Sequence, residues 1–481
     1  MSKEAVQVST LAGDAHLMKR AALSTLAALL LAPLAVHGRD LPADPGAATP
    51  LWELKLGLHQ YSIPTIDRGR IFVAVDDSAV QQPGYQPTGG GVLMCVEQAT
   101  GKLIWELPSP RYMEGVKPPY HFDQWRCGIC SQPLVDGERV FVVGNRGEVL
   151  CVDRNRGTVL WRYNFITELG VVPHDVCGST LLIVGDLVMA CTSNGLDDHH
   201  DKVPAPQAPT LVALDKETGR LVARDQERLG ERLLHCNWSS PSAGVVDGRT
   251  LVFFGGGDGI LYAFELPSSS HDGGVQPLKK VWSYDCNPPG YRMRDGMPVP
   301  HSTDRKLRTD GPSEIIGTPV FCGGRVYVAI GQSPLYGHGQ GCLSCVDAAA
   351  GQKVWDSTLV ERTLATPALA DGLLYIVDLT GNAHCFDAAT GERCWVHPLG
   401  AKTWCASPFV ADGKVYVSTE SNILWTLKAG RKLEVLSRTR WKTPPITLTA
   451  ADGVLYLPTQ RSLLAIPGEV SVTEPSQPGE R

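Results

Sequence analysis

Short apolar runs that alternate with polar positions recur along the chain about every forty residues. The segment from 130 to 165 shows one copy: "CSQPLVDGERVFVVGNRGEVLCVDRNRGTVLWRYNF". A strand with small residues and proline leads through Asp-Gly into an apolar strand. A Cys-Val-Asp strand follows, and then a strand that carries a tryptophan. Similar copies end at Trp105, Trp355 and Trp395. Four antiparallel strands joined by tight turns predict one blade of a β-propeller.

Counting the first strands predicts eight blades. These strands begin near residues 61, 130, 177, 238, 316, 364, 405 and 446. The eighth copy lacks a tryptophan strand, whereas "PLWELKLG" at 50 to 57 is such a strand without a blade. We therefore predict an all-β, eight-bladed β-propeller of four-stranded antiparallel blades over residues 50–468. Pairing of its N- and C-terminal strands would close the ring and remove exposed sheet edges.

The N-terminal residues are typical of an export signal. Residues 18–38 combine Lys19 and Arg20 with an apolar run and small residues near Gly38. That run of about fifteen residues is short for the ~20 that span a bilayer. We expect an upstream extension at 1–17, a signal peptide at 18–38, a linker at 39–49 and a disordered tail at 469–481. The mature protein is then periplasmic or secreted, with no membrane span.

Composition narrows the classes of partner. The chain has 481 residues, of which 43% are hydrophobic and 20% charged, with a net charge of -6. These values are typical of a soluble globular protein. They do not favour nucleic acid, which requires a basic surface. We expect a monomer that binds an unknown protein or small ligand.

The fourteen cysteines are explained mainly by the repeat. Cys95, Cys151, Cys345 and Cys385 occupy one position in their copies, where a small apolar side chain suits a buried strand. Cys127 and Cys130 form a C-x2-C pair, as do Cys342 and Cys345. Such pairs bind zinc in other proteins. A local disulfide between Cys127 and Cys130 is the alternative that we favour over zinc.

The turn sequences resemble a known family. "CFDAATGERCW" and "CVDAAAGQKVW" match the A-x-D-x-x-T-G-x-x-x-W tryptophan-docking motif of pyrroloquinoline quinone (PQQ) propellers. The resemblance covers residues 50–468 and implies eight blades, each with a tryptophan packed on the next blade. Two copies depart from it, because Ala223 replaces one tryptophan and Trp441 is displaced. We expect those two interfaces to be weaker.

This resemblance implies two functional classes. Quinoprotein dehydrogenases hold PQQ with calcium between a tryptophan and two adjacent cysteines. The other class resembles the propeller subunit of the outer-membrane protein assembly machinery, which binds partners without catalysis. Our chain has no adjacent cysteine pair and no C-x-x-C-H haem motif. We therefore favour a non-enzymatic binding or scaffolding module without a cofactor. The alternative is a PQQ-dependent dehydrogenase.

Loop lengths indicate where a site would lie. In a propeller, connections between blades and second-to-third-strand loops share one face. Six long segments fall into these two groups: 108–129, 165–176, 285–314, 76–91, 194–209 and 331–341. Only 267–280 belongs to the opposite face. Long loops on a rigid scaffold commonly carry binding residues.

Residues just before the first strands form the candidate ligand site on this face. They are Arg126, His174, Asp175, His235, Asn237, Trp238, Glu314, Arg362 and Trp404. Such polar groups also commonly cap strand ends without any ligand. In a binding site, Arg126 and Arg362 would bind an anion. His174 and His235 would bind a metal or transfer protons.

Two further motifs allow a structural interpretation. The "DDHHD" run at 197–201 offers metal ligands, but neighbouring side chains on an extended chain point apart. We therefore expect a solvated loop there. The glycine-rich "GGGDGILY" at 255–262 lies between two strands and predicts a hairpin turn, not a phosphate-binding loop.

Overall fold

The computed structural model describes residues 40–111, 125–175, 177–197, 199–267, 274–300, 311–333, 339–403 and 406–469. The upstream extension, the predicted signal peptide and Trp404 lie outside these ranges, as does the predicted tail beyond Glu469. Within the described residues, no helix is long and apolar enough to cross a membrane.

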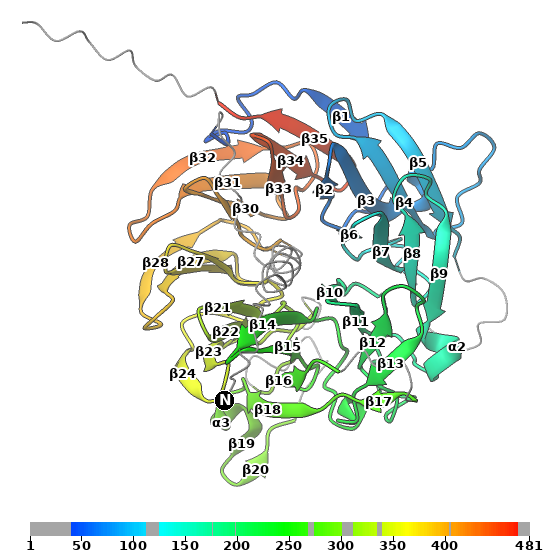
Figure 1. The fold of residues 1–481 in the computed structure, drawn as a ribbon. Helices are drawn as coiled ribbons and strands as arrows, with labels where there is room; N and C mark the ends of the chain where they lie inside the picture. Colours follow the sequence, from blue (N-terminus) through cyan, green and yellow to red (C-terminus); the bar gives the residue numbers. More distant parts are fainter. Residues whose placement is uncertain are drawn as a thin grey trace, which may run out of the picture.

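The described strands form a ring of eight antiparallel blades, as predicted (Figure 1). Blade one contains β2 (Thr65–Asp67), β3 (Arg70–Asp76), β4 (Gly91–Glu97) and β5 (Leu103–Ser109). Blade two contains β6 (Leu134–Asp136), β7 (Arg139–Gly144), β8 (Glu148–Asp153) and β9 (Val159–Asn164). Blade three contains β10 (Leu182–Val184), β11 (Leu187–Cys191), β12 (Leu211–Asp215) and β13 (Leu221–Arg224). Blade four contains β14 (Ser242–Val246), β15 (Arg249–Gly255), β16 (Ile260–Glu265) and β18 (Lys280–Asp285).

The second half of the ring repeats this order. Blade five contains β21 (Val320–Cys322), β22 (Arg325–Ala329), β23 (Leu343–Asp347) and β24 (Lys353–Ser357). Blade six contains β25 (Ala368–Ala370), β26 (Leu373–Val377), β27 (Asn382–Asp387) and β28 (Arg393–Pro398). Blade seven contains β29 (Phe409–Ala411), β30 (Lys414–Ser418), β31 (Ile423–Lys428) and β32 (Val435–Arg440). Blade eight contains β33 (Thr449–Ala451), β34 (Val454–Pro458), β35 (Ser462–Pro467) and β1 (Trp52–Lys55).

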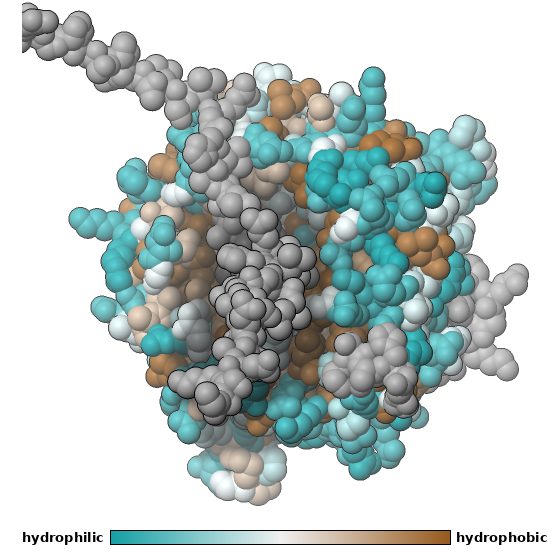
Figure 2. All heavy atoms as spheres, in the orientation of Figure 1, coloured by the Kyte–Doolittle hydropathy of each residue, from teal (hydrophilic) through white to brown (hydrophobic). Residues whose placement is uncertain are grey.

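A few short elements lie outside the blades. They are the helices α2 (Phe165–Leu169) and α3 (Pro289–Arg292), the 3-10 turns η2 (Asp77–Ala79) and η3 (Leu229–Glu231), the strand β17 (Gln276–Pro277), and the hairpin of β19 (Met293–Arg294) and β20 (Met297–Pro298). Except for β17, they lie in connections between blades or in the loop between a second and a third strand. In Figure 2, hydrophilic side chains cover much of the visible face between scattered hydrophobic patches.

Each repeat tryptophan faces a small residue inside its own blade and contacts the next blade. Cys95 and Trp105 are register partners, and both are buried. The Trp105 indole Nε1 donates to the Arg154 carbonyl of blade two at 3.0 Å. A Cβ at Gly157 would lie 2.6 Å from the same indole. Cys151, Cys345 and Cys385 pair with their tryptophans in the same way. The core role predicted for these cysteines is confirmed.

The ring is closed by the strand that the sequence leaves without a blade. β1 pairs antiparallel with β35, with Trp52 opposite Ala465 (Figure 1). Trp52 Nε1 donates to the Gln98 carbonyl of blade one at 3.1 Å. The predicted closure by N- and C-terminal strands is therefore confirmed.

The interface between blades three and four differs from its neighbours. Ala223 faces Ala213 at the position that a tryptophan occupies in other blades. The outer edge of blade three instead receives β17, which pairs in parallel with β13. In blade seven, Ser437 holds the equivalent place, opposite Thr426. Both departures from the repeat thus carry over into the structure.

Residues 40–49, predicted as a linker, pack on the propeller. Asp40 and Glu469 form an antiparallel bridge. The Leu41 amide donates to Asp412 at 2.7 Å, and Tyr416 donates to the Pro42 carbonyl at 2.9 Å. This segment therefore extends the contact between the N-terminal region and blades seven and eight.

Candidate functional site

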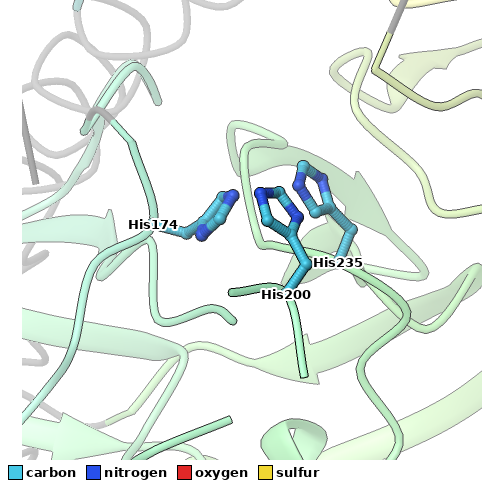
Figure 3. Close-up of side chains that lie close together, drawn as sticks. All are labelled: His174, His200 and His235. Atoms are coloured by element: carbon cyan, nitrogen blue, oxygen red, sulfur yellow. The ribbon is translucent and has the colours of Figure 1, made fainter. Parts of the chain in front are cut away.

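Three imidazoles meet between blades three and four, in the connections before β10 and β14 and in the loop from β11 to β12. His174 precedes β10, His200 lies in the loop from β11 to β12, and His235 precedes β14 (Figure 3). One ring nitrogen of each lies within 4.8 Å of the others. The ring centroids of His174 and His235 are 4.5 Å apart, and those of His174 and His200 are 4.8 Å apart. We call these three residues the histidine cluster.

Backbone contacts fix the position of His174. Its Nδ1 donates to the Leu196 carbonyl at 2.8 Å, because a carbonyl can only accept. The Leu196 amide donates in turn to the His235 carbonyl at 3.1 Å. A Cβ at Gly195 would lie 2.5 Å from the Cβ of His174, so this approach requires glycine. His174 Nε2 is buried, makes no hydrogen bond among the described residues, and lies 3.6 Å from Asp175 Oδ2.

His235 lies beside a buried carboxylate. Its Nδ1 is 3.5 Å from Glu314 Oε1 and 3.4 Å from Cys236 Sγ. The Cys236 amide donates to Glu314 Oε2 at 3.2 Å. Burial and the Glu314 carboxylate raise the pKa of Cys236 well above its usual value. Cys236 is therefore a neutral thiol in this environment.

A tight turn brings His200 into the cluster. The His200 amide donates to the Asp197 carbonyl at 3.0 Å, and His200 has a positive φ of 57°. The Asp201 amide donates to Asp197 Oδ1 at 3.0 Å. His199 is exposed, whereas Asp197 is buried and His200 is half-buried. The prediction of a solvated loop at 197–201 is therefore wrong for Asp197 and His200, because this turn replaces the extended chain that we assumed.

Burial keeps two of the imidazoles neutral. Desolvation, followed by the neighbouring His235, lowers the pKa of His174 to about 4. Desolvation, followed by His200, lowers the pKa of His235 to about 3. Neutral imidazole carries a nitrogen lone pair, so the cluster is suited to coordination at neutral pH.

Trp238 and Asn237 support the cluster from the start of blade four. The Trp238 ring lies edge-on to His235 at a centroid distance of 5.3 Å. Asn237 donates to the Asn194 carbonyl at 2.9 Å and accepts from the Gly257 amide at 2.9 Å. The side-chain amide of Asn237 therefore joins backbone segments of blades three and four. This is the structural role, without a ligand, that polar groups before a first strand commonly have.

The two arginines of the predicted site have different surroundings. Arg362 is buried and donates to Gln332 Oε1 and, at 2.8 Å, to the Gly311 carbonyl. Arg126 is exposed, and its methylenes lie beside Gly89. An anion would therefore reach Arg126 from solvent, whereas Arg362 holds two loops together.

Two other sequence predictions have structural outcomes. No disulfide joins Cys127 to Cys130, so the predicted local disulfide is not observed. The segment from Gly256 to Gly259 forms the turn between β15 and β16, with the Gly259 amide donating to the Gly256 carbonyl at 2.9 Å. This confirms the hairpin that we predicted in place of a phosphate-binding loop.

The structure thus gathers most of the predicted site and adds to it. His174, Asp175, His235, Trp238 and Glu314 lie in one neighbourhood. His200 and Cys236 were missed as site residues. The adjacent carboxylates and imidazoles of "DDHHD" were the available signal for His200. No pattern in the sequence singles out Cys236, whose neighbour His235 was identified.

Comparison with known proteins identifies relatives of this fold. The family model described as outer membrane protein assembly factor BamB matches residues 89–272 and 339–470, about two thirds of the chain. The curated outer membrane protein assembly factor BamB of Yersinia pestis is 23% identical over 242 residues. That alignment covers 46% of this chain and spans 59% of the length of the relative.

Solved structures show the same fold at low identity. BamB from Moraxella catarrhalis aligns with a TM-score of 0.57 and 15% identity, covering 90% of this chain and 99% of that chain. A europium-containing methanol dehydrogenase aligns with a TM-score of 0.53 and 14% identity, covering 86% of this chain and 84% of that one. These similarities show the propeller fold alone, since it occurs both in an assembly factor and in a dehydrogenase.

Proposed function

Because the chain belongs to the family described as outer membrane protein assembly factor BamB, we propose that it is an exported, non-enzymatic binding or scaffolding module. It acts in the periplasm or after secretion, and its partner is an unidentified protein or small ligand. The partner binds on the face that carries the long loops, which we call the loop face.

Buried hydrogen bonds within and between the loops of this face carry this proposal. Asn287 donates to the Ser313 carbonyl at 2.9 Å and accepts from the Ser313 amide at 2.7 Å. Asn237 joins blades three and four, and Arg362 holds the Gly311 segment. Loops held in this way lose little conformational freedom when a partner binds, which favours affinity.

The residues of the loop face do not fit PQQ in the manner of quinoprotein dehydrogenases. The sequence has no adjacent cysteine pair to cover the quinone. The buried Arg362 already donates to Gln332 and Gly311, and the ring of Trp238 lies edge-on to His235. We therefore derive no redox step for this chain.

A quinone titration of the exported protein separates the two functions. The absorbance spectrum is recorded with and without added PQQ and calcium, together with alcohol oxidation by an artificial electron acceptor. The binding-module proposal predicts an unchanged quinone spectrum and no turnover. Stoichiometric quinone binding with turnover would overturn it.

Co-purification tests whether the protein binds a partner. Tagged protein extracted gently from the native envelope should elute at a size above that of the isolated chain. Glutamate substitution of the exposed Trp125, which is 52% exposed on the loop face, should return it to the smaller size. The matched change Glu392→Lys, in an exposed turn between β27 and β28, should leave the complex intact. The reverse pattern would place the partner on the opposite face.

A further inference from the structure

We propose that His174, His200 and His235 bind a divalent transition-metal ion of the Zn²⁺ type, which joins blade three to blade four. The inference goes beyond the proposed binding function and does not depend on the identity of the partner. It rests on the number, spacing and orientation of the imidazoles.

The spacing of the cluster is close to that of a coordinated set. Zn²⁺ lies about 2.0–2.1 Å from imidazole nitrogens, so two ligands of a tetrahedral site are about 3.4 Å apart. The three ring nitrogens lie within 4.8 Å of one another before any ion is added. Small rotations of the side chains are enough to close this difference. His200 has the greatest freedom to make them because it is half-buried in a loop.

The hydrogen bond of His174 presents a lone pair to the centre of the cluster. Donation from Nδ1 to the Leu196 carbonyl leaves Nε2 unprotonated in the neutral ring. Nε2 is buried and makes no hydrogen bond among the described residues. A buried acceptor without a donor is costly, and a bound cation would remove that cost.

The Glu314 carboxylate lies beside the His235 ring nitrogen that would face away from a bound ion. Metal-binding histidines almost always donate their second nitrogen to a carboxylate or a carbonyl, which orients the ring. Here Nδ1 of His235 lies 3.5 Å from Glu314 Oε1, and Nδ1 of His174 donates to a carbonyl. Two of the three ligands thus have the outer contacts expected of a metal centre.

The ligand set selects the class of metal. Imidazole suits Zn²⁺, Cu²⁺ and Ni²⁺, whereas Ca²⁺ and Mg²⁺ prefer oxygen ligands. Three protein ligands leave one position of a tetrahedral ion for water or for Asp175, whose Oδ2 lies 3.6 Å from His174 Nε2. We therefore expect Zn²⁺ to bind and Ca²⁺ and Mg²⁺ not to bind.

The location gives the site a structural consequence. His174 lies in the connection that leads into blade three, and His200 lies in a loop of blade three. His235 lies in the connection that leads into blade four. The outer part of the same interface has Ala223 in place of a tryptophan. An ion held by all three side chains would link the two blades at their inner ends. Such an ion stabilises the folded state by mass action because the unfolded chain lacks the site.

Metal titration tests the proposal on the full chain. Protein stripped with EDTA is titrated with Zn²⁺ against a chromophoric chelator, and with Co²⁺ for its visible absorption. We expect one ion per chain, the intense visible bands of four-coordinate Co²⁺, and a rise in the melting temperature with Zn²⁺ or Co²⁺ but not with Ca²⁺ or Mg²⁺. His200→Ala should weaken Zn²⁺ binding at least 100-fold and abolish this rise. Glu314→Gln, which removes the carboxylate beside His235, should weaken Zn²⁺ binding about 10–100-fold.

His199→Ala is the matched control because His199 is the exposed neighbour of His200 in the same loop. This variant should bind Zn²⁺ like the unmodified protein. Both variants should melt at the unmodified temperature in EDTA, which separates ligand loss from misfolding. The proposal is overturned if the unmodified chain binds no Zn²⁺, or if His199→Ala and His200→Ala lose affinity equally.

Discussion

At the scale of single residues, environment rather than residue type determines what each candidate side chain does. Arg126 and Arg362 look equivalent in the sequence, yet one is exposed and the other is buried and donates to Gln332 and Gly311. Likewise, His199 is exposed, whereas its neighbour His200 turns into the histidine cluster. Their chemistry therefore follows from loop conformation.

The buried imidazoles make the stability of the metal-free protein depend on pH. In the unfolded chain they titrate near pH 6.5, but in the folded chain the pKa of His174 is about 4 and that of His235 about 3. Between these values the unfolded state binds more protons, so stability falls as the pH drops below 6.5. At pH 5 the loss is about 2 kcal/mol for each histidine. His200, Asp175, Glu314 and Cys236 face the same groups.

Urea unfolding in EDTA at pH 8 and pH 5 measures this effect. The double variant His174→Asn and His235→Asn is the reference, because it retains the other titrating groups. The unmodified chain should lose about 4 kcal/mol more than the variant between the two pH values. An equal loss in both proteins would show that at pH 5 these histidines are protonated in the folded state as well as in the unfolded state.

At the scale of single elements, contact between tryptophan and glycine links successive blades. Gly219, in the turn from β12 to β13, has a φ of 72°, and an added Cβ would lie 2.4 Å from the Trp161 ring. Gly185, in the turn from β10 to β11, has a φ of 58° and open space around it. Of these two glycines, only Gly219 combines a left-handed backbone with a close neighbour.

Alanine at these two glycines should have unequal effects. Both changes incur the cost of a left-handed alanine, about 1 kcal/mol. Gly219→Ala should cost a further 1–3 kcal/mol because Trp161 must move. Denaturant midpoints of the two variants provide the measurement. A larger loss at Gly185 would contradict the interblade role of Trp161.

The closing strand offers a second test at this scale. Trp52 packs near Tyr456 and donates to the Gln98 carbonyl, whereas the adjacent Leu51 is 57% exposed. Trp52→Ala should lower the free energy of unfolding by about 3 kcal/mol, the lower end for such truncations because the ring is half-buried. Leu51→Ala should change it by less than about 0.5 kcal/mol. Equal effects would mean that β1 contributes little to ring closure.

These elements also show how far the sequence predicts the structure. The period of the repeat determines strand order, so the blades, the Cys95–Trp105 register and the β1–β35 pairing were all predictable. Loop conformation has no such period. The turn that places His200 depends on local hydrogen bonds to Asp197, and Arg362 is buried through contacts with distant loops. The fold was therefore more predictable than the site.

At the scale of the whole molecule, closure makes the ring a rigid support for its loops. Apolar layers lie between adjacent blades, and residues of β1, β3, β4, β34 and β35 share one layer. Deleting residues 50–57 would leave β35 with an unpaired edge, which promotes edge-to-edge association. We expect this deletion to produce concentration-dependent oligomers in size-exclusion chromatography with light scattering. A monodisperse monomer would show that another segment covers β35.

We propose that partners bind the loop face. The most direct measurement is site-specific photo-crosslinking in the native envelope, with the photoreactive amino acid placed at Trp125 on the loop face or at Glu392 on the opposite face. Both positions are exposed, so each reports a contact without disturbing the core. We expect one discrete adduct from position 125 and none from position 392. An adduct from position 392 alone would contradict it.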